Sequence, residues 1–115
     1  MQYAHRNQID PKPISLREVK GTATDPSGVP FTCVGIFTDE VHRVLRYAQT
    51  DENGAFNVDV KGLPDGTYRL VAQAEPLCPA NAQIKLHSHS FRQKKLEVHM
   101  RPPGIDVCSW IEVAK

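Results

Sequence analysis

The sequence predicts an all-β sandwich of seven or eight short antiparallel strands. Apolar and polar residues alternate through most of the chain, and this period of two leaves each strand with one buried face. Turn signals that end in glycine separate the alternating runs, because glycine adopts positive φ without steric cost. The four turns lie at 25–28, 51–54, 63–66 and 101–104. Short strands between closely spaced turns are typical of sandwiches.

Each expected strand is one such alternating run. In chain order, the runs are 19–23, 34–38, 56–60, 68–74, 84–86, 96–100 and 107–113. The turns at 51–54 and 63–66 lie on either side of the run 56–60. We therefore expect these turns to fold three successive strands into a meander, with 56–60 as its middle strand.

One stretch, 39–49, has a helical spacing instead. Its apolar residues fall at positions i, i+3, i+4 and i+7, as on one face of a helix. We expect a single helical turn there that leads into a strand.

The same alternation of apolar and polar residues predicts which residues form the core of the domain. The predicted core residues are Val34, Ile36, Phe56, Val58, Tyr68 and Leu70. The glycines expected to set the turns are Gly28, Gly54 and Gly66. Substitution of a core position by a charged residue is expected to unfold the chain.

The length of 115 residues fits one domain. Residues 1–15 are polar and are interrupted by Pro11 and Pro13, so they are expected to be a flexible leader or linker. Residues 16–115 then form the single β-sandwich domain. The chain has neither a signal-peptide apolar region nor the roughly 18 consecutive apolar residues of a membrane span.

The charge balance argues against a nucleic-acid partner. Fourteen basic residues and thirteen acidic residues give a net charge of +1, whereas nucleic-acid-binding domains usually have a basic excess. The basic cluster at 92–95 is expected to be a solvated turn.

Cysteine usage favours an oxidising compartment. The three cysteines form no C-x-x-C pair, which argues against structural zinc. Cys78 and Cys108 lie among loop-forming residues, and a bridge between them would close a loop of 30 residues (108 − 78). Cys33 lies in an apolar run, where a partly buried thiol is expected; its pairing with either of the others is the alternative. A bridge favours export to the periplasm, cell surface or medium.

Two segments resemble a known family. They read VKGTATDPSGVPFTCVGIF and QTDENGAFNVDVKGLPDGTYRLVAQA, and the resemblance covers about residues 17–75. The residues that carry it are Gly21, Asp25, Gly28, Val29, Pro30, Thr50, Asp51, Gly54, Phe56, Leu63, Pro64, Gly66, Thr67 and Tyr68. In this order and spacing they resemble the carboxypeptidase regulatory-like domain, a transthyretin-like (prealbumin-like) β-sandwich.

The resemblance implies a Greek-key sandwich and a function without catalysis. Domains of this kind resemble binding or structural accessory modules of exported or cell-surface proteins. Transthyretin-like folds often associate, so the resemblance also implies a homodimer through sheet edges. A fold by itself does not establish a function.

Two enzyme families with a related sandwich fit poorly. Hydroxyisourate hydrolases have a Tyr-Arg-Gly-Ser tail, whereas this chain ends in SWIEVAK and has His5 in its polar leader. Intradiol dioxygenases bind iron through two tyrosines and an H-x-H pair. The chain has His87-x-His89, but Tyr3, Tyr47 and Tyr68 do not supply the tyrosine pattern. We expect no enzyme.

A less specific metal site is the main alternative. His87 and His89 would point to the same side of a strand and could bind a transition metal, together with His99 or Glu97. The other interpretation is two solvated histidines on a serine-rich edge, with no cofactor. For calcium, the candidates are Asp25, Asp39, Asp51 and Asn53. They form no D-x-D-x-D-G loop, and turn capping explains each of them.

Trp110 is the remaining candidate for ligand binding. It is the only tryptophan and lies near the end of the chain. The period of two places it on the strand face opposite Ile111 and Val113. As an exposed platform it would bind a sugar ring or a protein partner; as a core residue it would close one end of the sandwich.

Overall fold

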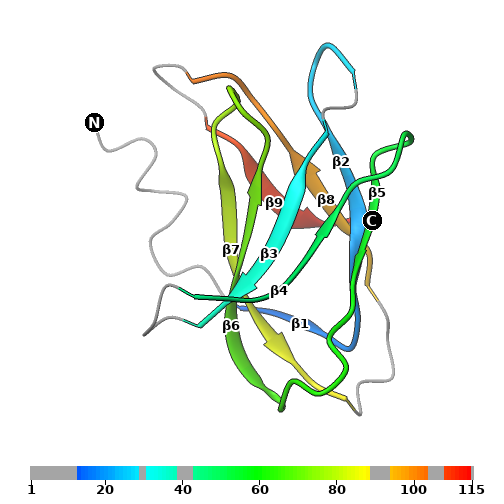
Figure 1. The fold of residues 1–115 in the computed structure, drawn as a ribbon, viewed down its shortest axis with the longest axis vertical. Coiled ribbons are helices and arrows are strands. Elements are labelled where there is room, and N and C mark those ends of the chain that lie inside the picture. The colour runs from blue at the N-terminus through cyan, green and yellow to red at the C-terminus, as the bar shows by residue number, and fades with distance from the viewer. Residues whose placement is uncertain (1–12, 29–30, 39–42, 89–93, 104–107, 115) are drawn as a thin grey trace.

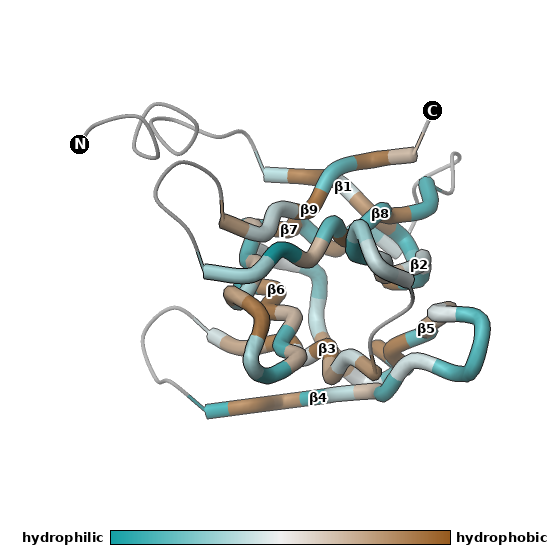
Figure 2. The backbone as a smooth tube through the Cα atoms, turned by 90° about the horizontal axis from the view of Figure 1, so that it is seen from above, coloured by the Kyte–Doolittle hydropathy of each residue, from teal (hydrophilic) through white to brown (hydrophobic). Residues whose placement is uncertain are grey.

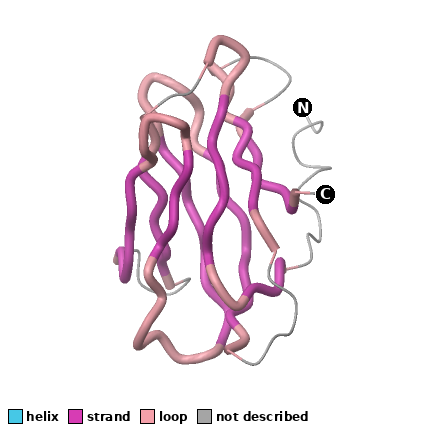
Figure 3. Tube along the Cα trace, turned by 90° about the vertical axis from the view of Figure 1, so that its right-hand side faces the viewer, coloured by secondary structure: helices cyan, strands magenta, loops and turns pink. Residues whose placement is uncertain are grey.

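In the computed structural model, the described residues are 13–28, 31–38, 43–88, 94–103 and 108–114. They form nine strands joined by loops, and this part of the chain contains no helix (Figure 3). The strands are β1 (Ile14–Leu16), β2 (Val19–Thr24), β3 (Cys33–Phe37), β4 (Val44–Gln49), β5 (Ala55–Val58), β6 (Gly66–Gln73), β7 (Ala80–Leu86), β8 (Leu96–His99) and β9 (Trp110–Val113). The all-β prediction is confirmed.

The strands form two sheets (Figure 1). The five-stranded sheet has the order β1-β7-β6-β3-β4, and the four-stranded sheet has the order β5-β2-β8-β9. Most neighbours are antiparallel, but β1 is parallel to β7 and β2 is parallel to β8. The prediction of a purely antiparallel fold of seven or eight strands is therefore wrong. The period of two reports which face of a strand is buried, and it carries no information about the direction of the neighbouring strand.

The predicted meander is also wrong. β4 and β6 both pair with β3, whereas β5 pairs with β2 in the other sheet. The turns at 51–54 and 63–66 therefore pass from one sheet to the other and back. The end of β4 stays attached to the segment before β3, since the Thr50 amide donates to the Thr32 carbonyl over 2.9 Å. After this contact the chain crosses to the other sheet.

The core lies between the two sheets, whose strands surround a common interior in Figure 2. All six predicted core residues are at most 7% exposed. Both sheets contribute to the core: Ile36 and Leu70 come from the five-stranded sheet, and Leu96 and Val98 from the other. β4 contacts β5, and β7 contacts β9, so the sheets approach each other at both sides. The radius of gyration, 13.6 Å, agrees with the roughly 13 Å of a compact chain of this length.

The helical spacing in 39–49 does not produce a helix in the residues that the structure describes. Residues 44–49 form β4, whereas 39–42 lie outside the described residues. In an edge strand burial is incomplete, so the apolar positions need not alternate strictly. Here Val44 and Tyr47 are both exposed, and the register of β3 against β4 shifts between Ile36 and Phe37.

The turn at 51–54 shows how sequence sets local structure. The Gly54 amide donates to the Asp51 carbonyl over 2.9 Å, and Gly54 has a φ of 83°. One carboxylate oxygen of Asp51 accepts bonds from the amides of Asn53 and Ala55. Gly28 and Gly66 also have positive φ, as expected. The glycine of the fourth predicted turn, Gly104, lies outside the described residues.

The first strand begins at Ile14, before the domain boundary expected at residue 16. Most of the predicted leader, residues 1–12, lies outside the described residues. Ile14 and Ser15, which the expected boundary placed in the leader, belong to β1 and pair with β7. Leu16 at the end of β1 is completely buried.

Gly21 is the position where β2 and β8 approach most closely. A Cβ atom at Gly21 would overlap the backbone carbonyl of Leu96, its register partner in β8. Because a backbone carbonyl within a sheet cannot move aside, we expect Gly21→Ala to lower the free energy of unfolding by about 3 kcal/mol or more. Chemical denaturation measures this. Thr22→Ala, on the exposed face of the same strand, is the control and should change stability by less than about 0.5 kcal/mol. A Gly21→Ala protein as stable as the control would contradict the β2–β8 pairing.

Candidate functional site

The outer face of the four-stranded sheet carries a group of polar and aromatic side chains along β8 and β9. In β8, Leu96 and Val98 point into the core, so Glu97 and His99 point outward. In β9, Ile111 packs against the core while Trp110 and Glu112 are exposed. The antiparallel register places Glu97 opposite Glu112 and His99 opposite Trp110. Together with Arg101, which follows β8, these four residues are called the His99 cluster.

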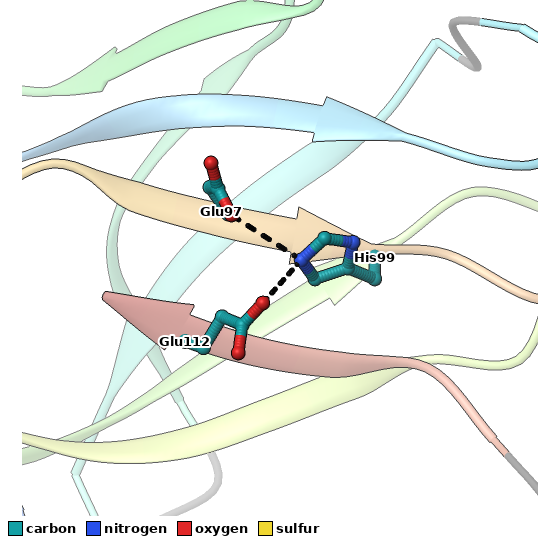
Figure 4. Close-up of side chains that lie close together, drawn as sticks. All are labelled: Glu97, His99 and Glu112. Carbon is teal, nitrogen blue, oxygen red and sulfur yellow. Dashed lines mark hydrogen bonds and ion pairs between the residues drawn. The ribbon is translucent and has the colours of Figure 1, made fainter. Parts of the chain in front are cut away.

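His99 lies between two carboxylates. Its Nε2 atom is 2.7 Å from Oε2 of Glu112 and 3.6 Å from Oε1 of Glu97, and both glutamates point toward the imidazole (Figure 4). The His99 side chain is 23% exposed, and those of Glu97 and Glu112 are about half exposed. The three ligand atoms all lie within 4.8 Å of one another. The three side chains are therefore accessible from solvent, while their backbones belong to paired strands.

Trp110 orients this group from the side. Its ring stacks on the His99 imidazole, with centroids 4.6 Å apart and an interplanar angle of 22°. The guanidinium of Arg101 lies 4.9 Å from the centroid of the Trp110 ring, within the range of a cation–π interaction. Trp110 is 36% exposed. Of the two interpretations of this residue, the structure supports an exposed aromatic on the sheet face rather than a core residue.

The disulfide anchors the strand that carries Trp110. Cys78 and Cys108 are bonded, with Cα atoms 5.7 Å apart, and Cys33 is the free thiol. The predicted pairing is confirmed, and the alternative pairings of Cys33 are wrong. Cys78 precedes β7 of one sheet, whereas Cys108 precedes β9 of the other, so the bond links the two sheets.

Hydrogen bonds strengthen the same junction. The Cys78 amide donates to the Arg101 carbonyl over 2.8 Å. The Ser109 hydroxyl donates to the Cys78 carbonyl over 2.5 Å and accepts a bond from the Arg101 amide over 2.8 Å. The backbone of Arg101 and the residue before Trp110 are thus both held to the Cys78 segment.

The predicted histidine pair is not brought together with His99 in the part of the chain that the structure describes. His89 lies outside the described residues. His87 follows β7 in the five-stranded sheet, where its amide donates to the Leu16 carbonyl over 2.8 Å. Among the described residues, the one group of three metal-binding side chains in close proximity is Glu97, His99 and Glu112.

Sequence reasoning found two members of this group and missed the third. His99 and Glu97 were named only as alternative partners of His87 and His89. Their spacing of two, which places them on one strand face, is the signal that could have grouped them. Glu112 carries no motif of its own. Its position opposite Glu97 depends on the register of β8 against β9, which the spacing of apolar residues alone does not specify.

The calcium candidates within the described residues belong to turns. One carboxylate oxygen of Asp25 accepts bonds from the amide and hydroxyl of Ser27, over 2.7 Å and 2.8 Å. The Ser27 hydroxyl is the main reason that the pKa of Asp25 lies below its ordinary value. Asp51 and Asn53 belong to the turn at 51–54, and Asp39 lies outside the described residues. The turn-capping interpretation is supported for Asp25 and Asp51.

A second surface lies on the outer face of the five-stranded sheet. It is a shallow hollow lined by Cys33, Gly35, Phe37, Val44, Tyr47, Val71 and Gln73. Its rim includes Val44 and Tyr47 of the edge strand β4, which are 45% and 66% exposed. The hollow is mostly apolar, whereas the His99 cluster is charged and aromatic.

Comparisons with protein-family models, curated proteins and solved structures return no match to this chain. Among the described residues, no helix has both the length and the apolar character needed to cross a membrane. The two surfaces and the disulfide are therefore the structural features that bear on function.

Proposed function

We propose that this chain is a non-catalytic binding module of an exported or cell-surface protein, with the Greek-key, transthyretin-like fold of the carboxypeptidase regulatory-like group. The Cys78–Cys108 disulfide supports an oxidising compartment, because such bonds persist mainly outside the cytosol. The family assignment rests on the sequence resemblance. The two facing sheets and the nearly buried Tyr68, whose hydroxyl donates to the Pro64 carbonyl over 2.6 Å, are compatible with it.

The observation that carries the proposal is the exposed Trp110, held in place by His99 and Arg101. Tryptophan and arginine are among the residue types that most often dominate the energy of protein–protein binding. The Trp110 ring is already held by its contacts with His99 and Arg101, so a partner would immobilise few additional groups. We propose a protein as the partner, bound on the outer face of the four-stranded sheet.

The absence of catalysis is proposed because the His99 cluster lies on an open sheet face. Catalytic sites generally exclude water around the reacting atoms, whereas both glutamates of the cluster are about half exposed. Ser88 is not arranged as a catalytic serine. Its hydroxyl donates to the Asp65 carboxylate over 3.3 Å. A serine nucleophile would instead be bonded to a histidine base.

Site-specific photocross-linking in the producing cells tests the proposal. A photoreactive residue at Thr22, which is exposed in β2 opposite Glu97, reports on the proposed surface without altering the cluster. The control position is Lys85, which is exposed in β7 of the other sheet. We expect a discrete product identified by mass spectrometry from Thr22, lost when Trp110→Ala is added. Equal products from both positions, or a product insensitive to Trp110→Ala, would contradict the proposal.

Carbohydrate binding through Trp110 is the alternative outcome. A glycan array with the wild-type chain and the Trp110→Ala variant distinguishes it, because stacking on a sugar requires the indole ring. The imidazole of His99 already occupies a stacking position on that ring, which favours the protein partner. Glycan signals that vanish in the variant, without a cross-linked protein, would reassign the surface.

We propose that the homodimer forms through the edges of the sheets. The edge strands are β1 and β4 in one sheet and β5 and β9 in the other. Of these, β4 carries exposed Val44 and Tyr47 beside the apolar hollow, so a second copy would pair there. The molar mass measured by light scattering over a range of protein concentrations decides this.

A further inference from the structure

We infer that Glu97, His99 and Glu112 bind a divalent transition-metal ion on the outer face of the four-stranded sheet. The inference rests on the proposed function in one respect: it assigns a metal ion as a ligand of the same surface. The group contains one imidazole nitrogen and two carboxylates, with the ligand atoms all within 4.8 Å of one another. No member of the predicted pair His87-x-His89 is required.

The ligand types select the class of metal. Imidazole is a good ligand for zinc, copper, iron and nickel, whereas sites for magnesium and calcium are built from oxygen atoms. A set of one nitrogen and two oxygens therefore favours a transition metal such as Zn²⁺. Three protein ligands leave further coordination positions to solvent or to a donor from a partner.

A metal ion requires rearrangement only of the half-exposed glutamate side chains, whose oxygen atoms lie within 4.8 Å of one another. Zinc binds histidine nitrogen and carboxylate oxygen at about 2.0–2.2 Å, so tetrahedral ligands lie about 3.4 Å apart. The separation of 3.6 Å between His99 and Glu97 already fits. The contact of 2.7 Å between His99 and Glu112 has to lengthen. Because the Glu112 side chain is half exposed, rotation about its own bonds achieves this without moving the strand.

The sheet register gives the metal an electrostatic role. Glu97 and Glu112 face each other across β8 and β9, and like charges in directly opposed positions are destabilising. A divalent cation between them replaces this repulsion by attraction. β8 lies between β2 and β9, so two of the three ligands are on a strand paired at both edges.

Trp110 and Arg101 serve as positioning residues. The stacked indole restricts rotation of the His99 imidazole, and the guanidinium of Arg101 holds the indole. Hydrogen-bonding partners orient metal ligands, and their loss typically weakens metal affinity or activity by about 10–100-fold. We expect the stacked indole to restrain His99 to a similar degree. Trp110→Ala is therefore expected to weaken metal binding by about tenfold or more while all three ligands remain.

Calorimetric titration of the oxidised full chain with Zn²⁺ tests the inference. We expect one ion per chain, and we expect both His99→Ala and the isosteric Glu112→Gln to weaken binding at least tenfold, the minimum loss seen for outer contacts. The matched controls are Glu75→Gln, at an exposed glutamate outside the cluster, and the double variant His87→Ala/His89→Ala. Both controls should bind Zn²⁺ as the wild type does. Far-UV circular dichroism verifies that each variant is folded.

Tryptophan fluorescence provides a second readout that reports position. Trp110 is the only tryptophan and stacks directly on the proposed ligand His99. Binding of paramagnetic Co²⁺ at His99 should quench its emission, and an excess of Zn²⁺ should restore it. The quenching should be absent in His99→Ala and present in the His87→Ala/His89→Ala variant.

Absence of Zn²⁺ binding by the wild type, or binding unaffected by His99→Ala, would overturn the inference. Binding lost only in His87→Ala/His89→Ala would move the metal to the predicted pair. The cross-linking experiment separates this result from the proposed function. A Thr22 product that depends on Trp110, in a chain that does not bind Zn²⁺, would overturn the metal site and leave the binding surface intact.

Discussion

Replacement of Leu70 by aspartate is expected to prevent folding. Leu70 is completely buried in β6, opposite Ile36 of β3 and Ala82 of β7. Loss of a buried leucine side chain typically costs about 2–5 kcal/mol, and burial of an unpaired carboxylate adds a further penalty. The sum, about 5 kcal/mol or more, is comparable to the whole stability of a domain, roughly 5–15 kcal/mol.

Expression followed by thermal unfolding measures the effect. Gln73→Asp introduces the same charge on the exposed side of the same strand and should fold and melt as the wild type does. Leu70→Ala removes the apolar side chain without adding charge, and it should fold with reduced stability. If Leu70→Asp yielded a soluble protein with a cooperative transition near that of the wild type, the core assignment would be wrong.

Removal of the disulfide is expected to cost about 3–4 kcal/mol, because the bond closes a loop of 30 residues in the unfolded chain. For a domain of this size, the corresponding decrease in Tm is roughly 10–20 °C. The Cys78→Ser/Cys108→Ser variant and the reduced wild-type protein should show the same decrease. Calorimetry or circular dichroism measures it.

Cys33→Ser is the matched control, since Cys33 is free and only partly buried. Its Tm should remain close to that of the wild type, and it should fall on reduction by the same amount. If Cys33→Ser instead removed the sensitivity to reduction, the disulfide pairing would be different. Because Trp110 follows Cys108 by two residues, loss of the bond should also change the Trp110 emission of the folded protein.

The sequence determined the interior of this protein. Val34, Phe56 and Leu70 were assigned to the core from a period of two, and all are buried. Burial is predictable because an apolar face must leave water wherever the strand is placed. The turn at 51–54 was predictable for a local reason, since the Asp51 carboxylate and Gly54 act within a few residues. The Cys78–Cys108 pairing was one of several that the sequence allowed.

Only the tertiary structure decided which strands are neighbours. The sequence pattern suggested that the run 56–60 would pair with the strands before and after it, but β5, which covers residues 55–58, pairs with β2 instead. The parallel pairs β1–β7 and β2–β8 also join segments far apart in the chain. A pattern of burial leaves such choices open, because several strands present similar apolar faces.

The candidate site depends on the same choices. Sequence spacing placed Glu97 and His99 on one strand face, and it placed Trp110 and Glu112 on another. The register of β8 against β9 then brought Glu112 within 2.7 Å of His99 and stacked Trp110 on its ring. A shift of one residue would turn the β9 side chains to the other face. The sequence therefore determined which side chains face solvent, and the sheet register decided which of them meet.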